Sequence, residues 1–206
     1  MDKSELRKRM LKKAKQQIEE NLSEKEVHVI RAIRLVDDLE EINNLLKENL
    51  GEWEKRSPDD AAKKMIETLR TNETALENER TELISFIEND MNTELPSFTS
   101  IAGPVIGARL LAEAGSKKRL AFAPSSTMQV WGAEKALFNH IKRKTDSPKH
   151  GHIFNHPLLQ KLPKTKRGKA ARILAGKLSI AARMDYFGKA LDSSLLKEVE
   201  KKINKL

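Results

Sequence analysis

Residues 27–53 read VHVIRAIRLVDDLEEINNLLKENLGEW. Apolar side chains recur along this stretch every three or four residues, which is the spacing of one buried helical face. They are Val29, Ile30, Ile33, Val36, Leu39, Ile42, Leu45, Leu46, Leu50 and Trp53. Gly51 and the following Ser57-Pro58-Asp59-Asp60 predict the end of this helix and the N-terminal cap of a second one. The stretch therefore predicts a long amphipathic helix with a defined stop.

A second periodic stretch follows the turn. It contains Ala61, Met65, Ile66, Leu69, Leu76, Leu83, Ile84 and Ile87 at helical spacing. Two long helices joined by a short turn that contains proline predict an antiparallel helical hairpin. The outer faces are rich in Glu, Lys and Asn, as in a solvated coiled coil. We therefore predict a coiled-coil hairpin over residues 23–96.

The segment before the hairpin has its own pattern. Residues 1–22 place four apolar side chains on one helical face, namely Leu6, Met10, Ala14 and Ile18. The other positions include seven Lys or Arg against four Asp or Glu, so we predict a separate basic amphipathic helix. It could dock on a phosphate backbone or on the hairpin, or fray in solution.

The composition changes after Pro96. The chain becomes rich in Ala, Gly and Leu, and short helical segments are separated by Gly and Pro. Small residues permit close helix approach, so we predict a compact helical module over residues 97–190 and a C-terminal helix over residues 191–206. No stretch shows sustained period-two alternation, so the predicted fold class is all-α.

The charge of the 206-residue chain is divided unevenly. Residues 1–96 carry 17 Lys and Arg against 23 Asp and Glu, a balance of −6, whereas residues 97–206 carry 22 against 7, a balance of +15. Within residues 117–177 the count is 15 basic to 2 acidic. Such a concentration is the electrostatic footprint of a polyanion-binding surface. A merely solubilising surface is the alternative, although mixed signs would serve that purpose.

Several classes of function find no support in the sequence. No apolar run approaches the roughly 20 residues needed to span a bilayer, and residues 1–20 lack the apolar core of a secretory signal. Cysteine is absent, which excludes disulfides, thiolate metal sites and a cysteine nucleophile and fits the cytosol. No P-loop or dinucleotide fingerprint is present, and no G-x-S-x-G elbow surrounds Ser125 or Ser126. We expect no catalytic residues, no cofactor and no membrane partner.

Histidines in the cationic region raise the question of a metal site. His140, His150, His152 and His156 include an H-x-H pair that could in principle ligate zinc. The run lacks cysteine and any nearby acidic ligand except Asp146, and the surrounding positive charge would repel a dication. We therefore expect no bound metal.

The strongest cationic pattern lies in residues 167–185, which read RGKAARILAGKLSIAARMD. Lys169, Arg172 and Lys177 recur at spacings of three to five residues and lie near one helical face. A helix with cations in register and Gly or Ala between them can lie close against a phosphate backbone. We predict that this helix carries a nucleic-acid-binding surface.

Two other features bear on this surface. Lys149 and His150 lie in a loop bounded by proline and glycine, where donors are exposed and a ligand can approach the backbone. Internal ion pairs are the alternative role for the arginines of the cationic helix, with Arg183 pairing with Asp185 or Glu134.

The segment PSSTMQVWGAEKALF at residues 124–138 predicts a loop followed by a helix N-terminus. Its Ser125-Ser126-Thr127 offers three hydroxyls and capping amides to a phosphate or to the polar groups of a partner. Glu134 and Lys135 follow on the outer face. The side chains available to pack are Trp131, Leu137 and Phe138.

These segments closely resemble the Nop domain family. The matching motifs are G-A-R-L at residues 107–110, A-G-S at 114–116, P-S-S-T-M-Q-V-W-G-A-E-K-A-L-F at 124–138, P-K-H-G-H-I-F-N-H-P at 148–157 and R-G-K-A-A-R-I-L-A-G-K-L-S-I-A-A-R-M-D at 167–185. Residues 27–53 also resemble the first coiled-coil helix of archaeal members. Nop domain proteins are scaffolds of archaeal and eukaryotic box C/D guide ribonucleoproteins, with a related splicing factor in small nuclear ribonucleoproteins.

The resemblance implies a helical hairpin topped by a compact Nop module, which recognises a kink-turn RNA together with the small ribosomal-type protein bound to that RNA. By motif position, the implied RNA-binding residues are Ser126, Lys149, His150, Arg167, Gly168, Lys169, Arg172, Lys177 and Arg183. The implied residues for the partner protein are Gln129, Gly132, Ala133, Glu134 and Lys135.

The chain departs from the family pattern at several points. Trp131 replaces a smaller aliphatic residue, Ser125 replaces alanine, and the hairpin is shorter and more polar around residues 52–72. Archaeal guide scaffolds carry a large N-terminal domain that recruits fibrillarin, whereas some 25 residues precede the hairpin here. We therefore expect a short, stand-alone archaeal member that does not bind fibrillarin. The alternative is an assembly protein that forms homodimers through the hairpin and binds RNA weakly.

Overall fold

The structure is a computed structural model that describes residues 5–7, 9–11, 15, 25–189 and 194–206. Its helices are α2 (Lys25–Glu54), α3 (Asp60–Glu94), α4 (Pro96–Ala102), α5 (Pro104–Ala114), α6 (Lys117–Phe122), α7 (Ser125–Val130), α8 (Glu134–Arg143), η1 (His152–Asn155), α9 (Pro157–Gln160), α10 (Lys164–Tyr186) and α11 (Ser194–Asn204). No strand occurs among the described residues, so the predicted all-α fold class is confirmed. The amphipathic helix predicted for residues 1–22 falls largely outside them, Ala14 and Ile18 included. None of the described helices combines the length and apolar character needed to cross a membrane.

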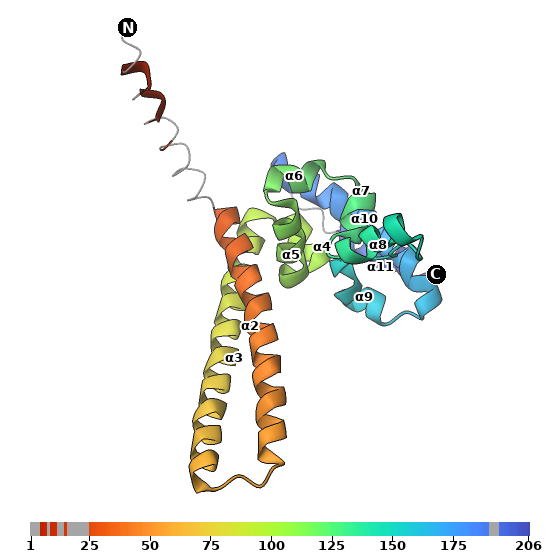
Figure 1. Cartoon of the computed structure of the whole chain (residues 1–206). Helices are drawn as coiled ribbons and strands as arrows, with labels where there is room; N and C mark the ends of the chain where they lie inside the picture. The colour runs from red at the N-terminus through yellow and green to blue at the C-terminus, as the bar shows by residue number, and fades with distance from the viewer. Residues whose placement is uncertain (1–4, 8, 12–14, 16–24, 190–193) are drawn as a thin grey trace.

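The helices α2 and α3 lie antiparallel and form the predicted hairpin, which extends away from the rest of the chain (Figure 1). The cap predicted from the sequence is present at the start of α3. The Asp59 carboxylate accepts a hydrogen bond from the Ala62 amide at 2.8 Å, and Asp60 adds negative charge to the first turn. Both features stabilise a helix N-terminus, so local sequence is enough to position the turn.

The contacts between the two hairpin helices change along their length. Near the module they are apolar, and Val29, Ile33 and Ile87 are at most 1% exposed. Farther out they are polar and charged: Asn43 donates to Glu77 at 3.1 Å, Arg80 lies 3.6 Å from Glu40, and Arg70 pairs with Glu54 at 3.0 Å. Ion pairs therefore join the helices where the apolar contacts thin out.

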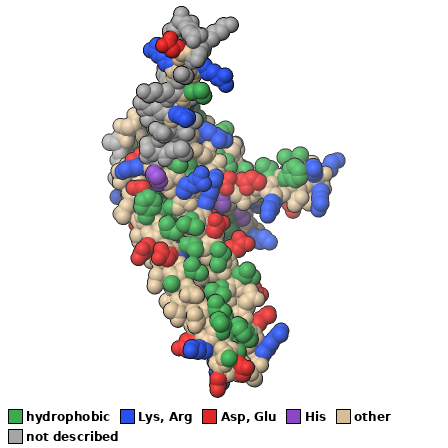
Figure 2. Space-filling view, turned by 60° about the vertical axis from the view of Figure 1, so that its left-hand side comes forward, with side chains coloured by type: hydrophobic (Ala, Val, Ile, Leu, Met, Phe, Trp, Pro, Cys, Tyr) green, Lys and Arg blue, Asp and Glu red, His purple; other side chains and the backbone are tan. Residues whose placement is uncertain are grey.

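Part of the apolar stripe predicted for residues 27–53 is not buried. Leu35, Ile42 and Leu45 are 47%, 52% and 61% exposed, and Figure 2 shows hydrophobic side chains along one face of the hairpin. Asn43 is turned toward α3 instead, and only 2% of it is exposed. Because the apolar pattern is wider than the contact with a single partner helix, its second side remains in solvent.

The helical module is built around α10, which packs against α4, α6, α7, α9 and α11. Its buried face consists mostly of small side chains, with two leucines at the centre. The buried residues are Ala170, Ala171, Leu174, Ala175, Leu178, Ser179, Ala181 and Ala182. Because alanine projects little from the helix surface, several neighbouring helices can approach α10 closely at once.

The module is fixed to the hairpin through α5, which contacts both α2 and α3. A Cβ added at Gly107 would lie 2.8 Å from the terminal carbon of Met91, so glycine permits α5 to approach α3. At the edge of this contact the Arg109 guanidinium donates from Nε to the Asp37 carboxylate at 2.9 Å and lies 3.5 Å from Glu40. Packing and ion pairs together define how the module sits on the hairpin.

Candidate nucleic-acid interface

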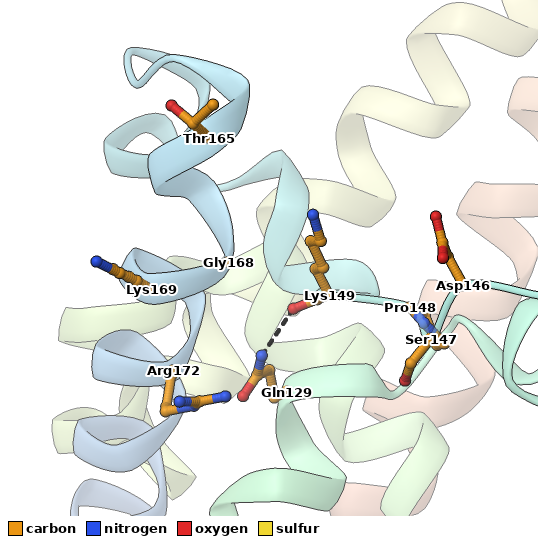
Figure 3. A pocket seen from close by; sticks show the side chains of 9 residues that line it. All are labelled: Gln129, Asp146, Ser147, Pro148, Lys149, Thr165, Gly168, Lys169 and Arg172. Atoms are coloured by element: carbon orange, nitrogen blue, oxygen red, sulfur yellow. Dashed lines mark hydrogen bonds between the residues drawn. The ribbon is translucent and has the colours of Figure 1, made fainter.

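A cationic pocket of about 540 Å³ lies between α10, α7 and the loop that precedes η1 (Figure 3). It is lined by Gln129, Asp146, Ser147, Pro148, Lys149, Thr165, Gly168, Lys169 and Arg172. Arg172 extends from α10 toward Gln129, whose side-chain amide donates to the Lys149 carbonyl at 2.7 Å. The pocket therefore brings together four of the predicted RNA-binding residues and one predicted partner-binding residue, which are far apart in the sequence.

Glycine at position 168 is not demanded by packing. A Cβ added there would meet the nearest atoms of Lys149 at 3.5 Å, which is ordinary van der Waals contact. Glycine within a helix destabilises it by about 1 kcal/mol relative to alanine. A glycine that packing does not need leaves the backbone of α10 bare at the pocket, where a ligand can approach closely.

His150 and Arg167 do not line the pocket but lie together beside it. The His150 ring stacks on Phe154 with centroids 4.5 Å apart and an interplanar angle of 19°, while the Arg167 guanidinium carbon lies 5.3 Å from the Phe154 ring centre. Burial lowers the pKa of His150 below its ordinary value, and the positive charges of Arg167 and Lys149 act in the same direction. His150 is therefore an uncharged stacking residue at neutral pH.

The remaining predicted RNA-binding residues lie outside the pocket. Ser126 is exposed on the first turn of α7. Lys177 is paired with the Glu198 carboxylate of α11. Arg183 lies farther along α10 and donates from Nε to the Ala121 carbonyl at 3.1 Å. The resemblance implied RNA contact for all of these residues, and the structure distributes them over the length of α10 and beyond.

The ion pair considered for Arg183 is absent from the described residues. Both oxygens of Asp185 accept backbone hydrogen bonds instead, from Ser97 at 3.0 Å and Phe98 at 2.8 Å, at the start of α4. Glu134 accepts from the Gly132 amide at 2.8 Å. Each carboxylate therefore accepts hydrogen bonds from backbone amides instead of pairing with Arg183. The amides at a helix start have no partner within their own helix.

The predicted partner-binding residues lie in and beside the turn between α7 and α8: Gln129 in α7, Gly132 and Ala133 in the turn, and Glu134 and Lys135 at the start of α8. Gly132 has a φ of 85°, and a Cβ added there would lie 2.5 Å from the His152 ring, so glycine is required. The following α8 has no buried residue. Phe138, which we expected to be available for packing, is 56% exposed, and Ile141 is 71% exposed. This helix presents an apolar face that nothing in the described chain covers.

Backbone hydrogen bonds join this turn to the loop that carries Lys149. The Gly151 amide donates to the Gln129 carbonyl at 2.9 Å, and the His152 amide donates to the Trp131 carbonyl at 2.7 Å. A Cβ added at Gly151 would lie 1.8 Å from the Trp131 carbonyl oxygen, so only glycine fits. We call these two hydrogen bonds the loop–turn bridge. The predicted RNA-facing loop and partner-facing turn are thereby held as one unit.

The histidines of the cationic region make separate contacts. The His140 ring contacts the Thr145 carbonyl, His152 lies 3.1 Å from the Glu113 carboxylate, and His156 donates to the Ile101 carbonyl at 2.9 Å. No group of three or more His, Asp or Glu side chains able to hold a metal ion occurs in the part of the chain that the structure describes.

The structure thus defines an all-α protein in which a coiled-coil hairpin carries a small-residue helical module with a cationic pocket. The chain belongs to the Nop family, whose model, described as snoRNA binding domain, fibrillarin, matches residues 9–205. The predicted resemblance is confirmed.

Individual relatives support this assignment. An uncharacterised NOP5 family protein of Methanocaldococcus jannaschii is 48% identical over 131 residues, which cover 64% of this chain and 32% of the relative. Nucleolar protein 58 of Mycosarcoma maydis is 41% identical over 111 residues, covering 54% of this chain and 19% of the relative. The matched part thus spans a third or less of these relatives. A solved structure titled as a fibrillarin/Nop5p complex matches with a TM-score of 0.72 and 33% identity over 98% of this chain and 77% of the matched chain.

The expectation that fibrillarin is not a partner is wrong. The solved relative that matches 98% of this chain comes from a complex with fibrillarin, and the matching family description itself includes fibrillarin. The expectation rested on the length of the segment before the hairpin. Partner binding depends on a complementary surface, and the number of residues that precede a hairpin carries no information about surfaces elsewhere.

Proposed function

We propose that this chain is an RNA-binding component of a ribonucleoprotein that recognises kink-turn RNA and its bound ribosomal-type protein as one composite surface. The observation that carries the proposal is the loop–turn bridge. It holds the loop with Lys149 against the turn with Gln129 and Gly132 through hydrogen bonds of 2.9 and 2.7 Å. Two candidate surfaces held in fixed relation suit a ligand that is itself made of two joined molecules.

The RNA side of the proposed interface is the cationic pocket. Lys149, Lys169 and Arg172 supply positive charge from two segments, and Gly168 leaves the helix backbone open between them. Arginine and lysine side chains together with exposed backbone are what proteins use to position a phosphate backbone. The pocket also contains Asp146, so the fit is to a shaped backbone with polar edges rather than to phosphate alone.

The protein side of the proposed interface is the 129–135 turn and the exposed face of α8. Phe138 and Ile141 offer apolar area to a partner, and Lys142 lies 4.5 Å from the Phe138 ring centre. Aromatic residues flanked by a polar rim are typical of protein interfaces. An amphipathic helix without a partner in its own chain is well suited to meet a second protein.

Free energy explains why the two surfaces should act together. Association costs at least about 4 kcal/mol in lost translational and rotational freedom. When RNA and partner protein are already joined, that loss occurs once while both surfaces gain contacts. The partner also holds the flexible RNA in its bent form, so the ordering of the RNA no longer opposes binding.

The test is a gel-shift titration of kink-turn RNA with and without the ribosomal-type protein. We expect much tighter binding to the binary complex. Lys135→Glu, on the first turn of α8, should weaken only the ternary complex, and Arg143→Glu, with the same charge change at the far end of α8, is its matched control. Equal affinity for free and protein-bound RNA would contradict composite recognition.

A second titration isolates the RNA side. Arg172→Ala should weaken binding and reduce the slope of log affinity against log salt by roughly 0.9 if the guanidinium neutralises one phosphate. Lys64→Ala, which removes an exposed cation from the hairpin, is the control and should leave the slope unchanged. An equal slope for Arg172→Ala and the unchanged chain would remove this helix from the RNA interface.

Fibrillarin enters as a further candidate partner, because the related Nop5p was solved in complex with it. The alternative function, assembly through the hairpin, has its own supporting observation in the exposed stripe of Leu35, Ile42 and Leu45. Sedimentation of the chain with Ile42→Glu and Leu45→Glu tests it. A dimer that becomes monomeric supports assembly through this stripe, and a monomer in both cases contradicts it.

A further inference from the structure

Three aromatic rings cluster at the surface where α6 meets the end of α10. Phe122 lies edge-to-face with Tyr186 at a centroid distance of 5.7 Å and with Phe187 at 6.1 Å, and Tyr186 lies 5.2 Å from Phe187. Their exposed fractions are 59%, 39% and 61%. Single exposed apolar residues are ordinary, whereas a contiguous group marks a binding surface. We call these three residues the aromatic cluster.

Cations surround the aromatic cluster at helical spacing. Lys118 and Arg119 precede Phe122 on α6 by four and three residues, and Arg183 precedes Phe187 by four, so the members of each set share a helix face. Arg183 also donates to a backbone carbonyl of α6 at 3.1 Å, which holds the two helices together beside the rings. None of these three cations forms a salt bridge within the described residues.

An exposed stripe along α10 connects the aromatic cluster to the cationic pocket. Its members are Lys169, Arg172, Gly176, Ile180, Arg183 and Phe187, which fall within a sector of about 80° at 100° per residue. All six are partly or fully exposed. At 1.5 Å per residue the stripe spans about 27 Å. One ligand that follows α10 can therefore reach both sites.

A groove of about 390 Å³ lies along the middle of this stripe. It is lined by Arg172, Ile173, Gly176, Lys177, Ile180 and Lys202. Because Arg172 lines both this groove and the cationic pocket, the two hollows adjoin. The surface of α10 is thus hollowed and cationic between the pocket and the aromatic cluster.

We infer that the aromatic cluster is a stacking site for unpaired nucleotides of the same RNA that the cationic pocket holds. This inference rests on the proposed RNA binding and extends the RNA path along α10. Proteins that bind single-stranded nucleic acid combine a cationic groove with aromatic side chains on which bases stack. The stripe supplies the groove, and Phe122, Tyr186 and Phe187 supply the rings.

Nucleic acid fits this surface better than a protein partner does. Lysine is depleted in protein interfaces, whose centres avoid charge, while here the exposed Lys118 lies one helical turn before Phe122. The cluster is also continuous with the cationic pocket rather than with the apolar face of α8. A partner protein would need acidic groups around an apolar centre, whereas RNA carries a base and a phosphate in every unit.

The test uses the full chain and two RNAs: a kink-turn RNA without a tail, and the same RNA with an unpaired tail of about eight nucleotides. About eight nucleotides is the length that a 27 Å path accommodates at 3.4 Å per step. We expect the tail to raise affinity by about tenfold or more. The double variant Phe122→Leu and Phe187→Leu keeps apolar volume but removes the π-faces, and should abolish the gain without affecting binding of the RNA alone. Phe86→Leu, at a hairpin position on α3 that is 42% exposed, is the control and should keep the gain.

Circular dichroism and thermal melting establish that the variants remain folded, and a free oligonucleotide of the same tail is titrated separately. If the kink-turn RNA does not bind, with or without the ribosomal-type protein, but the oligonucleotide binds in a cluster-dependent way, the proposed function fails and the stacking site stands. If the kink-turn RNA binds and the tail adds nothing, or adds as much in the double variant, the stacking site is overturned. Loss of a bound protein partner in the double variant, with no change in the effect of the tail, also overturns it and assigns the cluster to protein.

Discussion

The hairpin and the module of this chain are stabilised in different ways. In the outer hairpin, Asn43, Arg70 and Arg80 join the helices through polar contacts, and large apolar residues such as Ile42 stay in solvent. In the module, small side chains of α10 pack without exposure, and three of its cations, Lys149, Lys169 and Arg172, line one pocket. The hairpin therefore tolerates substitution along most of its length, whereas the module holds its binding surfaces by close packing that single atoms can disturb.

We expect the largest change in the free energy of unfolding from a core substitution in the module, compared with a surface substitution in the hairpin. Leu174 at the centre of α10 is 0% exposed, and Leu174→Ala should lower the free energy of unfolding by about 2–5 kcal/mol. Ile42→Ala, at a hairpin position that is 52% exposed, should change it by about 0.5 kcal/mol or less. Urea denaturation measures both. Trp53 reports on the hairpin and Trp131 on the module, so single-tryptophan versions follow each region separately. Equal losses for the two variants would contradict the contrast between the regions.

The second comparison concerns two glycines. Gly151→Ala should destabilise the module by about 1–3 kcal/mol, because the new Cβ would lie 1.8 Å from a backbone oxygen of Trp131. Gly51→Ala in α2 meets nothing within 4 Å and should stabilise the hairpin by about 0.5–1 kcal/mol. The loop–turn bridge adds a functional expectation, since Gly151→Ala should also weaken ternary binding. Unchanged stability and binding in Gly151→Ala would show that the bridge is not needed.

The sequence predicted the hairpin well because its signals are local. Helical spacing, the stop near Gly51 and the cap at Asp59 all act within a few residues. The cationic face of α10 was predicted for the same reason, since Lys169 and Arg172 are one turn apart. The resemblance to a known family then brought distant segments together, which spacing alone does not do.

Contacts between distant segments explain what was missed. The loop–turn bridge joins residues about twenty positions apart through backbone atoms, which have no signature in side-chain type apart from Gly151. The aromatic cluster joins Phe122 to residues at the end of α10, and each ring alone resembles a core side chain. The pairing of Lys177 with Glu198 depends on how α11 docks. One part of the aromatic cluster could have been predicted from the sequence. Tyr186 and Phe187 are adjacent aromatic residues that directly follow the predicted helix of residues 167–185.

Acidification should weaken the module through His156, which is 7% exposed. Its Nε2 donates to the Ile101 carbonyl and its Nδ1 accepts from the Leu158 amide, so the neutral ring uses both nitrogens. Burial lowers the pKa of His156 below the ordinary value of 6.5, with the Ile101 hydrogen bond acting in the opposite direction. As pH falls below 6.5 the unfolded chain takes up a proton that the folded chain resists, so stability is lost on the acid side.

The measurement is the free energy of unfolding between about pH 7 and pH 5, the range in which histidine ordinarily titrates. His156→Gln should be less stable at neutral pH and should show a shallower loss on acidification. His28→Gln, on the exposed side of α2, is the matched control from the hairpin and should keep the slope of the unchanged chain. An identical slope in His156→Gln would mean that another group causes the acid sensitivity.

The smallest expected change in stability comes from the buried polar residues, and it tests what each region uses them for. Asn43 in the hairpin is 2% exposed, and its Oδ1 has no hydrogen-bond partner among the described residues. Asn43→Leu removes that unsatisfied oxygen and leaves Glu77 paired with Arg80 at 3.0 Å, so stability should stay level or rise by up to about 1 kcal/mol.

A single buried asparagine in a coiled coil selects one register, so we expect a second set of amide signals from α2 and α3 in NMR spectra of the variant. Ser97→Ala is the counterpart in the module, where the buried hydroxyl also lacks a partner. It should yield one set of signals, because packing and the backbone hydrogen bonds from Ser97 and Phe98 to Asp185 hold α4 in place without that hydroxyl. If Asn43→Leu is less stable and still gives a single set of signals, then Asn43 stabilises the hairpin instead of selecting its register.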